Sequence, residues 1–362
     1  MKMLDNQEIL FFHFIARILR NKKELFEEGG NIEWQRFYDF AQKQSILGVV
    51  FEGIAKYEKE IQCYISKDIL FQWIGDSEFI KQQNRIAFKR SAEITELFAQ
   101  KGFKTCILKG QGNALMYDNP YSRASGDIDI WIDGTREEIN EIVKQNSTPV
   151  FEQSHHIDFP IYDDIEVEAH YVPSVLQKPS KNRKFQQWCQ EQKATQMSNR
   201  VVLPDGYGEI NVPMPDFNTV FQMAHMMEHF LTEGIGLRHF IDYFHVLGLN
   251  QNRTKTANLF KDFGLLRFAR GVMWIENRCL GLDEKFLIVE PDAKTGRVIL
   301  EEMLEGGNFG HFDERYKSRD KGLIARGLTD SYRLLKLAKV FPADTMWKLY
   351  RKVENQRWKL RQ

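Results

Sequence analysis

The sequence has no long hydrophobic run, no paired cysteines and no excess of charge of either sign. No apolar stretch approaches the roughly 20 residues of a membrane-spanning helix, so we expect no membrane segment. Lysine and arginine together number 50, and so do aspartate and glutamate. This balance gives no global sign of a nucleic-acid partner, although a local basic patch would still be compatible with one.

Cysteine is scarce, and the residues are Cys63, Cys106, Cys189 and Cys279. Their wide spacing argues against a zinc knuckle and against the disulfide framework of a small secreted domain. We therefore expect each cysteine to be a small buried hydrophobe, and we expect a cytoplasmic protein.

Apolar residues recur at helical spacing in both flanks of the chain. Residues 5–100 are predicted to be helical, with Asp5 as a cap, Gly102 as a C-terminal glycine cap, and one long helix or two in tandem over 69–101. Helices return from Asp216, and the last two are predicted at 322–341 and 344–359. The polar segment 173–199 is harder to assign, and its basic run at 178–184 is expected to be an exposed loop.

Between these flanks the hydrophobic period shortens to that of strands. We therefore predict an α+β protein in which a small mixed β-sheet is flanked by helices. Its parts are an N-terminal helical region at 1–100, a core at 101–205 and a C-terminal helical domain at 206–362.

One strand of the core carries acids at alternate positions. Side chains alternate between the faces of a strand, so Asp127 and Asp129 point one way, whereas Ile128, Ile130 and Ile132 point into a core. Carboxylates roughly 6–7 Å apart on one face repel each other. A pair of hard cations such as Mg²⁺ would relieve that repulsion. A half-buried strand with a solvated acidic face fits the same pattern, and this strand alone does not separate the two interpretations.

Two neighbouring features favour chemistry over simple exposure. A glycine-rich bend, Lys109-Gly110-Gln111-Gly112, precedes the acidic strand and would let backbone N–H groups approach phosphate oxygens. A later strand supplies a third acid, either Glu166 or Glu168, on the same face as His170. Three carboxylates around two divalent ions about 3.5–4 Å apart form a phosphoryl-transfer site.

In their order, these segments resemble the uncharacterised bacterial nucleotidyltransferases of the DNA-polymerase-β-like superfamily. The shared pattern is Leu-Lys-Gly, Tyr-x-x-Pro, Arg, Asp-hydrophobic-Asp and hydrophobic-Glu-x-His-aromatic, followed by His-x-x-x-His and Gly-hydrophobic-x-hydrophobic-Arg-His with a later Asp. The matching residues are Leu108 to Gly110, Tyr117, Pro120, Arg123, Asp127 to Asp129, Val167 to Tyr171, His225 to His229, Gly234 to His239 and Asp242.

The resemblance implies metal-dependent transfer of a nucleoside monophosphate from an NTP, with ATP the expected nucleotide, to an acceptor hydroxyl with release of pyrophosphate. The residues implied to be catalytic and to bind Mg²⁺ or Mn²⁺ are Asp127, Asp129 and Glu168. The residues implied to hold the triphosphate are Lys109, Gly110, Gln111 and Arg123. The acceptor could be a small molecule, a protein side chain or an RNA end, and the balanced charge disfavours a long nucleic acid.

Gln111 departs from many active members of the wider superfamily, in which serine follows the glycine of the bend and touches the triphosphate. Glutamine is larger and is oriented differently. Lys109 and Arg123 would then make the main contacts with the phosphates, or the protein would bind the phosphates weakly. A non-catalytic nucleotide-binding or regulatory protein that kept the fold stays open as an alternative.

The segment from His225 to His229 also has the His-x-x-Glu-His spacing of an inverted zinc-protease motif. A zinc peptidase would need a further acidic ligand, and Glu233 or Asp242 is nearest in sequence. We favour instead a helical wall facing the nucleotidyltransferase cleft, with Arg238 and Asp242 paired. The residues that could contact substrate are His170, His225, His229 and Arg238.

Overall fold

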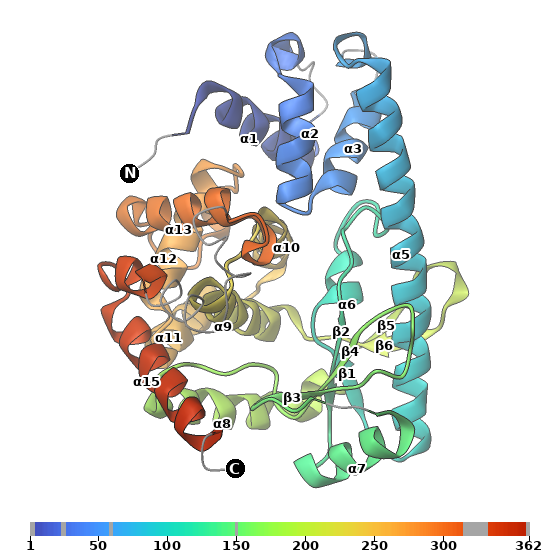
Figure 1. Cartoon of the computed structure of the whole chain (residues 1–362), viewed down its shortest axis with the longest axis vertical. Coiled ribbons are helices and arrows are strands. Elements are labelled where there is room, and N and C mark those ends of the chain that lie inside the picture. The colour runs from blue at the N-terminus through green and yellow to red at the C-terminus, as the bar shows by residue number, and fades with distance from the viewer. Residues whose placement is uncertain (1–3, 23–26, 58–60, 149–150, 314–331, 360–362) are drawn as a thin grey trace.

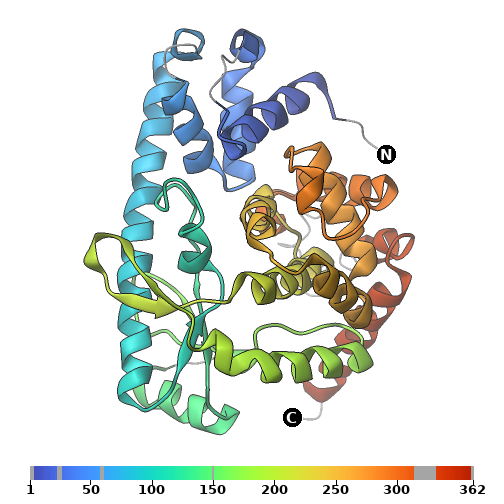
Figure 2. The same cartoon turned by 180° about the vertical axis from the view of Figure 1, so that it is seen from behind.

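Helices form both ends of the chain, and a small sheet lies between them (Figures 1 and 2). The computed structural model describes residues 4–22, 27–57, 61–148, 151–313 and 332–359. The first part of the helix predicted at 322–341 lies outside these residues. The predicted α+β class with a small mixed sheet is confirmed.

The N-terminal part consists of helices joined by short turns. Its elements are α1 (Asn6–Leu19), a 3₁₀ turn (Glu27–Asn31), α2 (Trp34–Lys43), α3 (Leu47–Lys56), a second 3₁₀ turn (Gln62–Tyr64) and α5 (Lys67–Gln100). Asp5 caps α1 as predicted, because its Oδ1 accepts hydrogen bonds from the backbone N–H groups of Gln7 and Glu8. Helix α5 is one continuous helix, and it ends just before Gly102, whose φ is +86°.

The sheet has the strand order β1-β2-β4-β3, in which β2 and β4 run parallel and the two outer pairs are antiparallel. Its strands are β1 (Thr105–Ile107), β2 (Ile128–Ile132), β3 (His156–Asp158) and β4 (Val167–His170), and the helices inserted between them are α6 (Gly110–Ala114) and α7 (Arg136–Asn146). The alternation predicted for the acidic strand is present. Ile128, Ile130 and Ile132 lie in one hydrophobic cluster with Phe98 of α5 and Val143 of α7.

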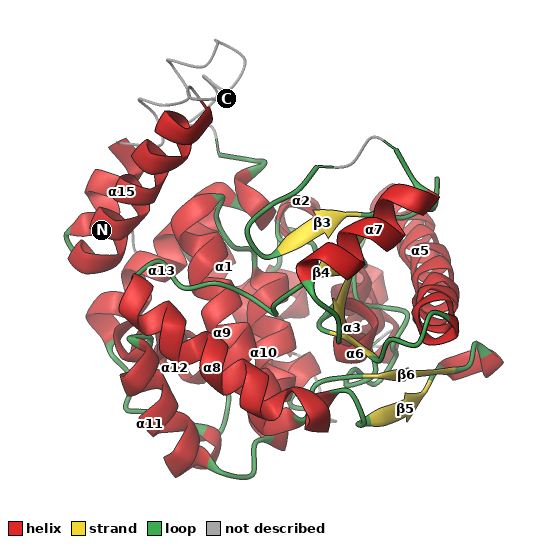
Figure 3. Ribbon diagram, turned by 90° about the horizontal axis from the view of Figure 1, so that it is seen from below, coloured by secondary structure: helices red, strands yellow, loops and turns green. Residues whose placement is uncertain are grey.

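The remaining helices follow the sheet, and Figure 3 shows them beside it. They are α8 (Pro179–Gln196), α9 (Pro215–Thr232), α10 (Leu237–Leu249), α11 (Arg253–Phe263), α12 (Leu266–Arg278), α13 (Ala293–Gly306) and α15 (Pro342–Lys359); β5 (Arg200–Val202) and β6 (Glu209–Asn211) form a hairpin between α8 and α9. The basic run at 178–184 is not the expected loop. It forms the start of α8, where Pro179 occupies a first-turn position that tolerates proline.

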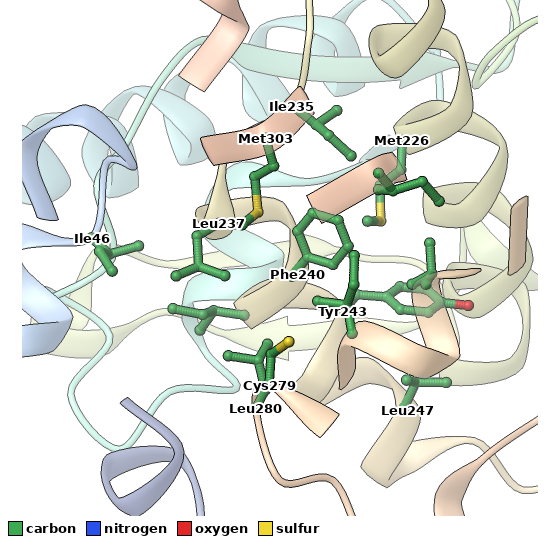
Figure 4. Close-up of a cluster of buried hydrophobic side chains, with 14 of the residues drawn as sticks. Ile46, Met226, Ile235, Leu237, Phe240, Tyr243, Leu247, Cys279, Leu280 and Met303 are labelled. Atoms are coloured by element: carbon green, nitrogen blue, oxygen red, sulfur yellow. The ribbon is translucent and has the colours of Figure 1, made fainter. Parts of the chain in front are cut away.

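A larger hydrophobic cluster joins the two ends of the chain. It contains side chains from α1, α2 and α3 together with side chains from α9 to α13. Figure 4 shows Ile46, which precedes α3, in one group with Leu237 and Met303. No helix in the described part of the chain combines the length and apolar character needed to cross a bilayer.

Three cysteines are buried as expected, namely Cys106, Cys189 and Cys279. Cys63 is exposed, so the expectation was wrong there. The reason is local, because Cys63 lies in a short 3₁₀ turn between helices.

Candidate active site

The three predicted acids meet on the polar face of the sheet. Asp129 of β2 pairs directly in register with Glu168 of the parallel strand β4, and Asp127 immediately precedes β2. One carboxylate oxygen from each of the three residues lies within 4.8 Å of the others. The period-2 alternation explains the arrangement, because it sends these acids to the face opposite the isoleucines.

The carboxylates have pKa values shifted in opposite directions. The negative charge of Asp129, together with burial, raises the pKa of Asp127 to about 6. Burial would also raise the pKa of Asp129, but Lys109 and His170 outweigh it and hold this pKa below its usual range. The positive groups of the protein therefore do not fully compensate the negative charges of Asp127 and Asp129. An all-oxygen donor set with this repulsion fits a hard divalent cation such as Mg²⁺ or Mn²⁺.

Lys109 supplies positive charge to this group. Its Nζ lies 2.9 Å from Asp129 Oδ1 and 2.9 Å from His225 Nε2 on α9. The following residue, Gly110, has φ +47°, a conformation that favours glycine. The bend thus turns the chain into α6 directly after the lysine. The contact between Lys109 and His225 links the glycine-rich bend to α9.

Gln111 is buried, and its side chain is committed to α5. Its Nε2 donates a hydrogen bond to Asn84 Oδ1 at 3.1 Å, and Asn84 in turn donates to the backbone carbonyls of Tyr121 and Arg123. The amide therefore anchors the bend and the loop before β2. It would have to leave these partners to reach a nucleotide.

Arg123 is also buried and engaged. Its Nε and Nη2 donate to the two carboxylate oxygens of Asp242 at 2.8 and 2.7 Å, and Tyr117 donates to Asp242 at 2.6 Å. Burial would raise the pKa of Asp242, but Arg123 outweighs it and lowers this pKa to about 2. The expected pairing of Asp242 with Arg238 is therefore wrong, because Arg123 approaches with a geometry that matches both oxygens.

Arg238 lines a small cavity together with Lys109, Asp127, Asp129 and His225. Its Nη1 donates to the carbonyl of Ala124 at 3.0 Å, and its guanidinium lies 5.6 Å from the Phe309 ring centroid. Phe309 has φ +52°, which is uncommon for a residue other than glycine. A loop far along the chain thus adds a wall to the cavity.

The histidines predicted to contact substrate occupy two places. His170 lies on β4, with its Nε2 3.0 Å from Asp129 Oδ1 and 3.2 Å from Glu168 Oε2. Burial would lower the pKa of His170, but hydrogen bonds to Asp129 and Glu168 raise it to about 9. His225 touches Lys109, and His229 lies farther along α9 with Nδ1 3.5 Å from Glu233.

The zinc-protease alternative gains no support from these positions. The Glu228 carboxylate accepts a hydrogen bond from Ser174 Oγ at 3.1 Å, while His225 is engaged by Lys109. Within the described ranges, the groups of His, Cys, Asp and Glu spaced for a metal ion do not include these α9 residues.

An open groove begins at Asp127 and Glu168 and follows the segment that connects β3 to β4. It is lined by the exposed rings of Phe79 and Phe151 and by further acids, including Glu166. Glu166 thus lies at the rim of the site. Glu168 is in register with Asp129, and it is the acid that lies in one group with Asp127 and Asp129.

Sequence reasoning missed several residues of the site. Asn84 lies in the helix predicted at 69–101, where a polar residue close to the apolar stripe was the available signal. His156 is the first residue of β3, and no motif in the sequence marks it. Phe309 left no signal, because only the fold brings its loop to the cavity.

Residues 30–281 match the model of a family described as uncharacterised nucleotidyltransferase. No curated protein matches the chain. Among solved structures, an antigenic nucleotidyltransferase-like protein from Paracoccidioides brasiliensis aligns over 58% of this chain and 96% of that chain, with 13% identity and a TM-score of 0.33. That structural similarity is too low to add to the family match.

Proposed function

Since the chain belongs to this family of uncharacterised nucleotidyltransferases, we propose that it transfers a nucleoside monophosphate from an NTP, ATP being the first to test, to an acceptor hydroxyl. The observation that carries the proposal is the group formed by Asp127, Asp129 and Glu168, whose oxygens lie within 4.8 Å of one another. These residues would hold Mg²⁺ or Mn²⁺. Bound there, the metal would neutralise charge on the phosphates.

The reaction would exchange one bond to the α-phosphorus for another. The acceptor oxygen forms a bond to that phosphorus, and the bond to the β-phosphate oxygen breaks, so that pyrophosphate leaves. The proton of the acceptor hydroxyl passes to the Glu168 carboxylate. Catalysis would then rest on positioning and charge stabilisation.

Lys109 and Arg238 are the cations best placed to hold the triphosphate. Both line the small cavity beside Asp127 and Asp129. Arg238 Nε is buried without a hydrogen-bond partner among the described residues. Burial and the charge of Arg123 lower the pKa of Arg238 in spite of the nearby Asp242 and Asp127. An anionic phosphate would supply further negative charge. Arg123 also lines the cavity, but its Nε and Nη2 are already bonded to Asp242. Gln111 supports the site through Asn84.

The groove beside Glu168 favours one class of acceptor. Its lining combines the exposed rings of Phe79 and Phe151 with carboxylates that include Asp158, Asp163 and Glu166. Carboxylates repel the phosphodiesters of an RNA end. A neutral or cationic small molecule with an apolar portion, or a protein side chain, therefore suits the groove better.

We expect the wild-type protein to bind an NTP in the presence of Mg²⁺ and to release pyrophosphate when an acceptor is supplied. Asp129→Asn should lose metal-dependent binding and lower turnover by at least about 100-fold, the scale of removing one preorganised electrostatic contact. Glu137→Gln is the control, because this exposed carboxylate of α7 lines neither the small cavity nor the groove, and it should change little. Binding would be measured by calorimetry and turnover by pyrophosphate release.

Equal NTP binding by wild type and Asp129→Asn would contradict the proposed site. Metal-dependent binding without turnover across a panel of acceptors would instead identify a nucleotide-binding or regulatory protein.

A further inference from the structure

Two imidazoles approach the same oxygen of Glu168 from neighbouring strands. His156 of β3 and His170 of β4 are partners in the antiparallel register. His156 Nδ1 lies 3.1 Å from Glu168 Oε2, and His170 Nε2 lies 3.2 Å from that same oxygen. One donor atom from each of the three residues lies within 4.8 Å of the others.

His156 carries an independent sign of a missing partner. Its side chain is only 4% exposed, and neither ring nitrogen has a hydrogen-bond partner among the described residues. Oxygens of Glu168 and Asp158 lie 3.1 and 3.5 Å away, but neither forms a hydrogen bond with the ring. Buried polar groups are rarely left in this state, and a bound ion is one of the few explanations.

His170 is oriented as a metal-binding histidine would be. Its Nδ1 lies 3.3 Å from the carbonyl of Val172, to which it can donate a hydrogen bond. That contact fixes the ring and leaves Nε2 directed at Glu168 Oε2 and at Asp129 Oδ1, 3.2 and 3.0 Å away. A backbone carbonyl on the second ring nitrogen is the common support of metal-ligating histidines.

The distances from each imidazole to Glu168 are close to those between neighbouring ligands of a tetrahedral ion. Nitrogen and oxygen ligands lie about 2.0–2.1 Å from Zn²⁺, which places neighbouring donors roughly 3.3 Å apart. The two contacts of Glu168 Oε2, at 3.1 and 3.2 Å, are close to this spacing. Two imidazoles with one carboxylate favour a transition metal, whereas Mg²⁺ prefers oxygen ligands throughout.

We propose that His156, Glu168 and His170 form a binding site for a divalent transition-metal ion, with Zn²⁺ as the ion that suits the donors best. The site is different from the all-oxygen group of Asp127, Asp129 and Glu168, with which it has Glu168 in common. It goes beyond nucleotidyl transfer, because the ion can bind whether or not the protein has turnover.

The test titrates metal-free full-length protein with Zn²⁺ in the absence of Mg²⁺ and nucleotide, by calorimetry with a competing chelator. We expect one Zn²⁺ per chain. His156→Ala and His170→Ala should each weaken Zn²⁺ binding by at least about 10-fold. Loss of a residue that only supports a metal ligand already lowers metal affinity by about 10-fold or more, and loss of a ligand should cost at least as much. His229→Ala is the matched control from α9 and should bind as wild type does. Co²⁺ should give visible absorption bands typical of tetrahedral coordination in the wild type and not in His156→Ala.

Absence of Zn²⁺ binding by the wild type would overturn the proposal, and so would loss of binding in His229→Ala with retention in His156→Ala. Thermal unfolding in chelator shows whether each variant folds, and His156→Gln provides a second, less disruptive change. Asp127→Asn separates the two proposals, because it should keep Zn²⁺ binding while losing Mg²⁺-dependent binding of NTP.

Discussion

Glu276 of α12 has a fully buried carboxyl group. Neither carboxylate oxygen has a hydrogen-bond partner among the described residues. Burial raises the pKa of Glu276 well above its usual value, because the charged form loses its hydration. The folded state therefore holds the proton more tightly than the unfolded state does. The contribution of this group to stability is fully present below the unfolded pKa of 4.5 and is lost as the pH rises.

The substitution Glu276→Gln keeps the side-chain shape and removes this titration. We expect the variant to exceed the wild type in free energy of unfolding by roughly 1–3 kcal/mol near pH 8, with a smaller gain near pH 5. Urea denaturation at the two pH values measures it. Glu284→Gln is the exposed control and should stay within about 0.5 kcal/mol of wild type. An equal gain at both pH values would contradict the assignment.

Single residues of the site differed in how far the sequence predicted them. Strand alternation placed Asp127 and Asp129 on one face but left Glu166 and Glu168 open as the third acid, and only the family resemblance favoured Glu168. The partner of Arg123 could not be predicted, because Asp242 lies far along the chain and only helix packing brings it near. His156 gained its importance from the pairing of β3 with β4, which no local pattern specifies.

At the scale of elements, apolar spacing decided which helices could be found. Helix α5 has an apolar stripe, a serine cap and a glycine after its end, so propensity, pattern and caps agree. Helix α8 is rich in Lys and Gln, and its buried apolar positions, Phe185 and Cys189, are few. Packing of these few residues outweighs a local sequence that is typical of a loop.

Two glycines inside helices should respond to alanine in opposite ways. A Cβ on Gly75 of α5 would meet nothing within 4 Å, so Gly75→Ala should stabilise the protein by roughly 0.5–1 kcal/mol through helix propensity. A Cβ on Gly48 of α3 would lie 2.3 Å from the carbonyl oxygen of Ser122. Gly48→Ala should therefore destabilise by roughly 1–3 kcal/mol.

Chemical denaturation of both glycine variants measures the two effects. Stabilisation by Gly48→Ala would contradict the close approach of α3 to the carbonyl of Ser122.

Across the whole molecule, Gln44 connects segments far apart in sequence. It is fully buried after α2, its Nε2 donates to the carbonyl of Met303 at 3.1 Å, and its Oε1 accepts from the backbone N–H of Leu237 at 2.9 Å. The hydrophobic cluster around it also contains both ends of the chain. The sequence predicted two helical flanks but gave no sign that they pack on each other, because apolar faces do not identify their partners.

Gln44→Ala would leave two buried backbone groups without a partner. We expect a loss of roughly 2–6 kcal/mol in the free energy of unfolding, at about 1–3 kcal/mol for each group. Gln42→Ala, two residues earlier and exposed, should change little. Denaturation followed by fluorescence and by circular dichroism measures both variants. Wild-type stability of the Gln44→Ala variant would contradict this role. Selective unfolding of the N-terminal helices, with the rest of the protein intact, would contradict it as well.

The link from Gln44 to Met303 also sets an order of events during synthesis on the ribosome. The two residues are 259 positions apart. At about 5–20 residues per second, Met303 is made roughly 13–50 s after Gln44. For that interval, the faces of α1, α2 and α3 that will join the shared cluster lack their C-terminal partners. The nascent chain therefore exposes apolar surface to chaperones until α13 emerges, and the N-terminal helices complete their packing late although they are translated first.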